Sequence, residues 1–290
     1  MGIFIDGLSL GAIYALIALG YTMVYGIAKM LNFAHGDVIM VGAYTVFATL
    51  ALDNSVAFKI LAVVLAVIIC TVLGIFVEKL AYKPLRGASP LAVLITAIGV
   101  SYLLQSISQL VFGTAQKQVL LGINGNFKIG SLVIPHSTVI TVIAASVIMV
   151  TLTLFVNYTR TGRAMVAVSE DKGAAQLMGV NVNMIIALTF AIGSALAAVA
   201  SVFYLMRIPA VSPTFGSMPG IKAFTAAVIG GIGSMPGAMI GGILLGIIEA
   251  VCSSIEPISA YTPAIEFSLL ILILLVRPVG LLGKKRREKV

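Results

Sequence analysis

Long uncharged runs rich in Leu, Ala, Ile and Val, separated by short stretches with charges or turn residues, form the pattern of this chain. A membrane-spanning helix needs about 20 mostly apolar residues, and the runs lack the apolar–polar alternation of barrel strands. We therefore predict an all-α polytopic membrane protein. The eight clear candidate spans are residues 7–25, 38–52, 60–77, 90–112, 135–156, 184–206, 236–253 and 262–276.

A ninth apolar segment, 221–234, is short and rich in glycine. Three basic clusters, at 79–86, 160–172 and 277–289, hold twelve of the eighteen basic residues and should face the cytoplasm by the positive-inside rule. Eight crossings would leave the last cluster outside, so either 221–234 crosses or one of its neighbours is re-entrant. We expect eight to nine transmembrane helices with a broken or re-entrant helix near 221–234, because irregular backbone at membrane depth survives only within protein or beside a water-filled cavity.

The composition agrees with a membrane protein. Hydrophobic residues make up 60% and charged residues 10% of the chain, and the mean hydropathy is +1.14, whereas soluble domains are about 45–50% apolar and 25% charged. This excludes a secreted disulfide scaffold, a disordered tail, a coiled coil and a soluble enzyme. The net charge of +8 lies in short clusters, which indicates membrane orientation and not nucleic-acid binding. The two cysteines lie in separate apolar runs, so we expect no disulfide framework, metal centre or cofactor.

The first apolar run has no basic region ahead of it and carries Asp6 instead, so we expect a retained span and not a cleaved signal peptide. The whole chain, 1–290, then forms one transmembrane domain. We assign an external loop to 113–134, a cytoplasmic loop to 157–183 and a basic cytoplasmic tail to 277–290.

The cytoplasmic loop at 157–183 predicts a short surface helix or a pair of helices. Between Arg163 and Met178 there is no proline and only one glycine, and the polar residues 169–171 are suited to cap a second short turn. Gly179 is well placed to terminate a helix. Two interpretations stay open: a solvated connection between spans, or a docking element for another protein.

Three sequence blocks resemble one family of transport proteins. The blocks are LNFAHGDVIMVGAY (31–44), TGRAMVAVSEDKGAAQLMGV (161–180) and GIKAFTAAVIGGIGSMPGAMIGG (220–242). In order and spacing they are similar to the blocks of branched-chain amino acid ABC transporter permeases, and the resemblance covers nearly the whole chain. In that family the second block is the cytoplasmic coupling segment. The residues here that match its pattern are Arg163, Glu170, Asp171, Ala174, Ala175 and Gly179.

The resemblance implies a single permease domain in a bacterial inner membrane, belonging to an ATP-driven importer of branched-chain amino acids or related small amides. It also implies four kinds of partner: a second homologous permease, two cytoplasmic ATP-binding subunits, a periplasmic amino-acid-binding protein and membrane lipid. The chain has no G-x-x-x-x-G-K-[ST] motif, so we expect no ATPase activity of its own.

Candidate pathway residues lie in the first and third blocks, where polar or glycine-rich stretches interrupt apolar runs. They are Asn32, Phe33, His35, Gly36, Lys222, Phe224, Gly230, Gly231 and Gly233. Most have a structural alternative: Asn32 or the neighbouring Asp37 can cap a helix end, and the glycines can serve close helix packing. Lys222 can snorkel to the surface or meet a substrate carboxylate.

Two other classes of function fit the sequence less well. A stand-alone secondary transporter or channel predicts paired carboxylates or a basic relay buried in the spans, and only Glu249 comes close; we expect that residue to form an interfacial salt bridge. An intramembrane enzyme would need a nucleophile–base pair or a metal set at depth, and the sequence supplies neither.

Overall fold

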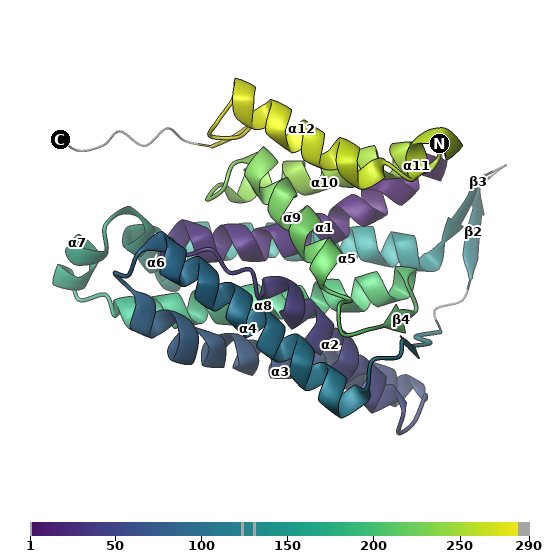
Figure 1. Ribbon diagram of the computed structural model, residues 1–290, viewed down its shortest axis with the longest axis horizontal. Helices are drawn as coiled ribbons and strands as arrows, with labels where there is room; N and C mark the ends of the chain where they lie inside the picture. Colours follow the sequence, from purple (N-terminus) through teal and green to yellow (C-terminus); the bar gives the residue numbers. More distant parts are fainter. Residues whose placement is uncertain (1, 123–124, 130–131, 284–290) are drawn as a thin grey trace.

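The computed structural model describes residues 2–122, 125–129 and 132–283, and helices account for most of them (Figure 1). The helices are α1 (Gly2–Ala28), α2 (His35–Leu50), α3 (Val56–Val77), α4 (Pro90–Phe112), α5 (His136–Tyr158), α6 (Arg160–Glu170), α7 (Lys172–Leu177), α8 (Val182–Arg207), α9 (Ser217–Gly230), α10 (Met235–Ser253), α11 (Glu256–Ser259) and α12 (Thr262–Val276). A π-helical turn (Glu78–Tyr82) and a 3-10 turn (Lys83–Leu85) follow α3. The strands are β1 (Lys117–Gln118), β2 (Asn126–Ile129), β3 (Leu132–Pro135) and β4 (Ala210–Val211).

Six helices in the described part of the chain are long and apolar enough to cross a membrane: α1, α3 with the turns that follow it, α4, α5, α8 and α10. Helix α12 is apolar but has only 15 residues, and α2 and α9 have 16 and 14. At about 1.5 Å per residue, α9 spans about two thirds of a 30 Å hydrocarbon core. The fold is an all-α polytopic one, and the count of eight to nine crossings stays a prediction.

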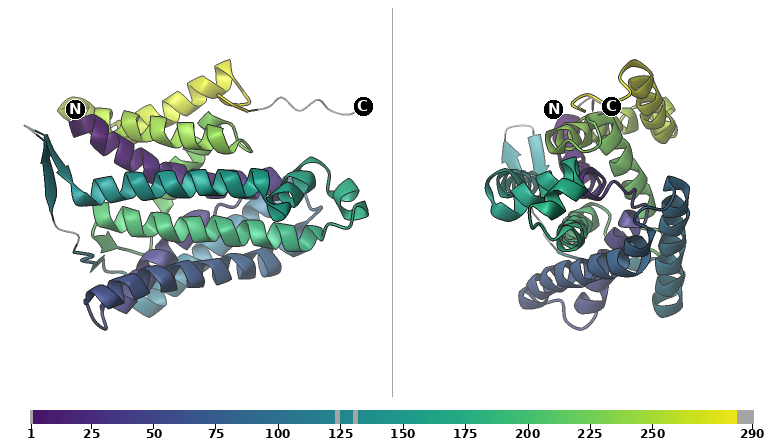
Figure 2. Two further views of the ribbon diagram at one scale, coloured as in Figure 1. Left: turned by 180° about the vertical axis from the view of Figure 1, so that it is seen from behind. Right: turned by 90° about the vertical axis from the view of Figure 1, so that its left-hand side faces the viewer.

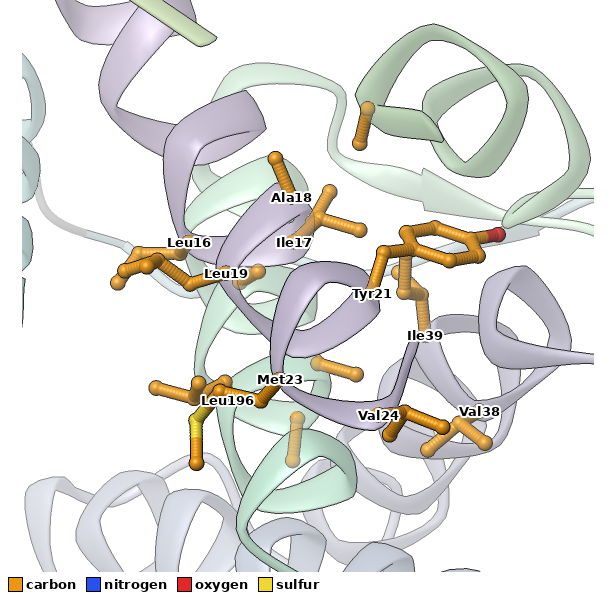
Figure 3. Packing of buried hydrophobic residues seen from close by; sticks show 14 of the residues in the cluster. Leu16, Ile17, Ala18, Leu19, Tyr21, Met23, Val24, Val38, Ile39 and Leu196 are labelled. Atoms are coloured by element: carbon orange, nitrogen blue, oxygen red, sulfur yellow. The ribbon is translucent and has the colours of Figure 1, made fainter. Parts of the chain in front are cut away.

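Helix α1 forms the centre of the molecule, and it lies near the middle when the structure is viewed along its long axis (Figure 2, right). Its side chains are buried almost without interruption from Ser9 to Val24. Figure 3 shows Met23 of α1 beside Leu196 of α8, and Val24 beside Val38 of α2. A helix that is apolar on all sides is typical of a buried position.

Glycines bring α1 and α10 into backbone contact. A Cβ atom on Gly246 would lie 2.1 Å from the amide nitrogen of Gly11, and one on Gly242 would lie 2.4 Å from that of Ala15. Small residues at i and i+4 allow this approach between membrane helices, where van der Waals packing replaces the hydrophobic effect as the driving force. Gly242 and Gly246 thus allow α10 to pack against the backbone of α1.

The two ends of the molecule differ. Helices α6 and α7 and the end of α12 lie at one end, and the N-terminus and β2–β3 at the other (Figure 1); we name these the basic end and the hairpin end. Beyond α12, the amides of Leu281 and Leu282 donate to the carbonyls of Ile229 and Gly230, at 2.8 and 2.9 Å. The C-terminal end of α9 therefore lies at the basic end.

Short strands organise the hairpin end. Strands β2 and β3 form an antiparallel hairpin in which Asn126 pairs with Pro135. Strand β1, just after α4, pairs with β4, just before α9, with Lys117 opposite Val211. This second ladder joins two segments that are far apart in the sequence.

The corrections to the predicted boundaries are small. The loop assigned to 157–183 is shorter, because α5 continues to Tyr158 and α8 begins at Val182. Within it, Asp171 caps α7, with its Oδ1 accepting the amides of Gly173 and Ala174 at 2.8 and 3.0 Å. The last seven residues of the tail, 284–290, lie outside the described residues.

The α1–α10 contact gives the first prediction. Gly246→Val should lower the stability of the protein in detergent by about 1–3 kcal/mol or more, because the new side chain meets the backbone of α1. Thermal unfolding followed by size-exclusion chromatography measures this change. The control is Gly99→Val in α4, where a Cβ atom meets nothing within 4 Å; equal losses in both variants would contradict the packing argument.

Candidate functional site

The connection between α1 and α2 turns back into the helix bundle before α2 begins (Figure 1). Lys29 starts it with a left-handed backbone, φ 60°. Asn32 is buried at 4% exposure, and the Tyr82 hydroxyl donates to its Oδ1 at 2.8 Å. Because a buried amide needs hydrogen-bond partners, this bond fixes the interrupted segment to the turn after α3.

His35, the first residue of α2, is packed deep in the protein. It is 1% exposed, and its ring meets that of Tyr21 edge to face, with centroids 4.6 Å apart. A Cβ atom on Gly20 would lie 2.5 Å from His35 Nε2, so only glycine leaves room for the imidazole. Nε2 has no hydrogen-bond partner among the described residues.

The first turns of α2 and α9 meet at their backbones. A Cβ atom on Gly216 would lie 1.7 Å from the carbonyl oxygen of Gly36, and one on Gly220 would lie 2.9 Å from the Cα of Gly36. The aromatic rings of Phe33 and Phe224 lie beside this contact, with centroids 5.4 Å apart. The two short helices therefore begin at one place, which the structure builds from both the first and the third sequence blocks.

A pocket of about 270 Å³ opens at this junction. Tyr21 of α1, Asp37 of α2 and Gly220 of α9 line it, together with Ser101 and Gln105 of α4. Asp37 is 2% exposed, and Gln105 Nε2 donates to its Oδ1 at 2.8 Å. We name this the junction pocket.

The structure brings only some of the predicted pathway residues to the junction pocket. Phe33 and Gly36 line it, and His35 and Phe224 contact its wall through Tyr21. The three glycines 230, 231 and 233 do not line it. They lie at the turn between α9 and α10. A Cβ atom on Gly230 would lie 1.9 Å from the carbonyl oxygen of Gly237, and Gly231 and Gly233 have positive φ angles of 108° and 94°.

Lys222 lies in a buried group of charges on another side of α9. Its side chain is 8% exposed; Nζ lies 2.7 Å from Glu249 Oε1 and 3.3 Å from Glu266 Oε2. The hydroxyl of Tyr14 donates to Glu249 Oε2 at 2.7 Å. The lysine neither snorkels to the surface nor stands free to meet a substrate carboxylate. It joins α9 to α10 and α12 by ion pairs, and Tyr14 adds α1 to the group.

Glu266, Asp37 and Gln105 were not predicted as site residues from the sequence. Glu266 is the one charged residue of its candidate span, Gln105 is one of several polar residues in another, and Asp37 directly precedes a third, where it can also serve as a helix cap. A signal was present, because ionisable or amide side chains inside membrane segments are costly and mark partners or pathways. Counting apolar runs does not use that signal.

The coupling-segment residues lie at the basic end. Arg163, Glu170, Asp171, Ala174 and Gly179 are exposed, and Ala175 is buried. Gly179, with φ 83°, ends α7.

One contact links this segment to α1. The Lys172 ammonium donates to the carbonyl oxygen of Ala28, the last residue of α1, at 3.0 Å. Partial burial, and then the neighbouring Arg86 guanidinium, lowers the pKa of Lys172. Arg86 in turn bonds to Glu78 and Asn183. The segment is thus held against the chain just before the interruption that leads to the junction pocket.

Short helices that meet at a small, partly polar pocket inside a helical membrane protein are typical of membrane transport proteins. Comparison with known families gives the particular one: the model described as "Branched-chain amino acid transport system / permease component" matches residues 3–276. The chain belongs to this family, and it is a membrane permease subunit, not an enzyme.

Curated relatives agree over nearly full length. The chain is 44% identical to the high-affinity branched-chain amino acid transport system permease protein BraD of Pseudomonas aeruginosa, over 99% of this chain and 96% of the relative. It is 44% identical to LivH of Escherichia coli, over 98% and 96%, and 27% identical to a probable LivH of Methanocaldococcus jannaschii, over 92% and 88%. The resemblance drawn from the three sequence blocks is confirmed.

The buried charge group gives the second prediction. Lys222→Met should destabilise the protein by about 3–5 kcal/mol, because it leaves the carboxylates of Glu249 and Glu266 without their cation. Thermal unfolding in detergent is the measurement. The triple variant Lys222→Met, Glu249→Gln, Glu266→Gln should recover much of the loss, whereas Lys128→Met, in an exposed strand, should change nothing. A Lys222→Met protein as stable as the parent would show that the ion pairs contribute little.

Proposed function

We propose that this chain forms the membrane path for branched-chain amino acids in an ATP-driven importer of a bacterial inner membrane. The observation that carries the proposal is the family match over residues 3–276. The junction pocket supports it, because apolar and polar side chains meet there on helices whose ends lie within the protein. A periplasmic binding protein delivers the substrate in this proposal, and a second homologous permease completes the path.

The proposed topology has nine crossings, with α2, α9 and α12 added to the six long helices. Two observations support it. The basic residues around 79–86, 160–172 and Arg277 then face one side of the membrane, as the positive-inside rule requires. The hydrogen bonds from Leu281 and Leu282 to the end of α9 also favour a complete crossing by that helix.

Topology is testable with single cysteines in a background of Cys70→Ala and Cys252→Ala. Ser234→Cys, between α9 and α10, should react with a membrane-impermeant maleimide only when the cytoplasmic face is open to it. Ser254→Cys, after α10, should react from outside in intact spheroplasts. Labelling of both positions from the same face would contradict a crossing by α10 and with it the nine-span arrangement.

The proposed site of ATPase docking is the α6–α7 segment. Leu177 and Met178, at its tip, are 90% and 84% exposed, and large apolar side chains so placed are suited to the groove of a partner. Lys172 connects the same segment to the end of α1. Movement of the two ATP-binding subunits would thus be transmitted through the Lys172–Ala28 hydrogen bond to the segment between α1 and α2.

The importer proposal is tested with the whole complex in proteoliposomes. The parent should take up leucine only with ATP and the binding protein, and Leu177→Asp with Met178→Asp should reduce this uptake at least tenfold and release the ATP-binding subunits during purification. The matched control is Leu120→Asp in the external loop, where the side chain is 66% exposed; the ATP-binding subunits should stay bound. Leucine uptake by the chain alone without ATP would instead support the gradient-driven carrier.

A further inference from the structure

Among the described residues, Asp37 differs from the other buried and half-buried carboxylates within the helix bundle in lacking a cation. Glu249 and Glu266 pair with Lys222, and Glu78 pairs with Arg86. Among residues 2–122, 125–129 and 132–283, Asp37 forms no ion pair; Gln105 supplies one hydrogen bond to it. The first turn of α2 stabilises the carboxylate through the helix dipole, which is equivalent to roughly half a charge. A charge buried at membrane depth is otherwise costly.

The Asp37 carboxylate lies at the wall of the junction pocket. Asp37 and Gln105 line the junction pocket, and so do the apolar side chains of Phe33, Ile98 and Ile221. The volume of about 270 Å³ is just below the range of about 300–1,000 Å³ typical for drug-sized ligands, which suits a smaller molecule. The junction pocket thus offers a carboxylate for a positively charged group and apolar side chains for an aliphatic one, in a space of about the size of an amino acid.

The surface of α4 beside the pocket is mixed: it exposes apolar side chains such as Ile95, Leu103 and Leu110, and a less apolar stripe runs between them. Helix α4 exposes Gly99, Tyr102, Ser106 and Gln109, which recur at the spacing of one helical face. Polar side chains in the middle of a span normally face protein or a water-filled cavity. This stripe therefore favours contact with the second permease of the importer, and the pocket then opens toward the path between the two subunits.

We propose that Asp37 binds the α-ammonium group of the amino acid in the membrane, while Phe33, Ile98 and Ile221 contact its aliphatic side chain. The inference rests on the proposed function and adds a residue that selects for an amine. Gln105 is the positioning residue, because its amide holds one oxygen of the carboxylate. The permease itself would then discriminate against aliphatic acids and amides, independently of the binding protein.

The test measures protection of a cysteine in the assembled complex without binding protein. Ser101→Cys, in the Cys70→Ala, Cys252→Ala background, places a thiol in the pocket wall. Millimolar leucine and 3-methylbutylamine, which carry the ammonium group, should each slow its modification by a methanethiosulfonate reagent at least threefold. The acid 4-methylpentanoate, which has the same carbon skeleton without the amine, should not. Asp37→Asn should abolish the protection.

Transport provides the second measurement and separates the two proposals. Asp37→Asn should lower ATP-dependent leucine uptake at least tenfold while the complex assembles and still hydrolyses ATP; Asp53→Asn, an exposed acid whose Oδ1 accepts the amide of Ser55, should leave uptake unchanged. Protection by 4-methylpentanoate equal to that by leucine, protection by sodium ions alone, or normal uptake by Asp37→Asn would each overturn the role of Asp37. Absence of ATP-dependent leucine uptake by the parent complex would overturn the proposed function itself.

Discussion

Every interruption of a helix in this protein must find hydrogen-bond partners inside the protein, because lipid offers none. The break after α1 meets this demand with Tyr82, whose hydroxyl bonds to Asn32 and approaches the carbonyl of Leu31 at 3.5 Å. The end of α9 meets it with the amides of Leu281 and Leu282. Both short helices are thus held by segments distant in the sequence.

Much of the architecture follows from the sequence. The apolar runs locate the long helices within a few residues, and the shortness and glycine content of 221–234 indicate that α9 is short. The three blocks identify the family. These signals are local or additive along the chain, so a single sequence contains them in full.

The candidate site is harder to predict because it depends on pairing across helices. Lys222 has the same local sequence whether it snorkels, meets substrate or pairs with Glu249 and Glu266, and only the packing of α9 against α10 and α12 decides between these outcomes. Asp37 likewise satisfies the pattern of a helix cap. Its distinguishing property, a missing cation beside Gln105, emerges only when α2 and α4 lie side by side.

The ladder between β1 and β4 limits how the transport cycle can proceed. It pairs Lys117 with Val211 and Gln118 with Ala210, and residues 212–216 connect it to the start of α9. Sliding β4 together with α9 along the membrane normal by one strand residue, about 3.4 Å, would break both pairs, whereas swinging α9 about the ladder would preserve them. The ladder is therefore suited to act as a pivot at the hairpin end, which favours movement of α9 by rotation over movement by a piston stroke.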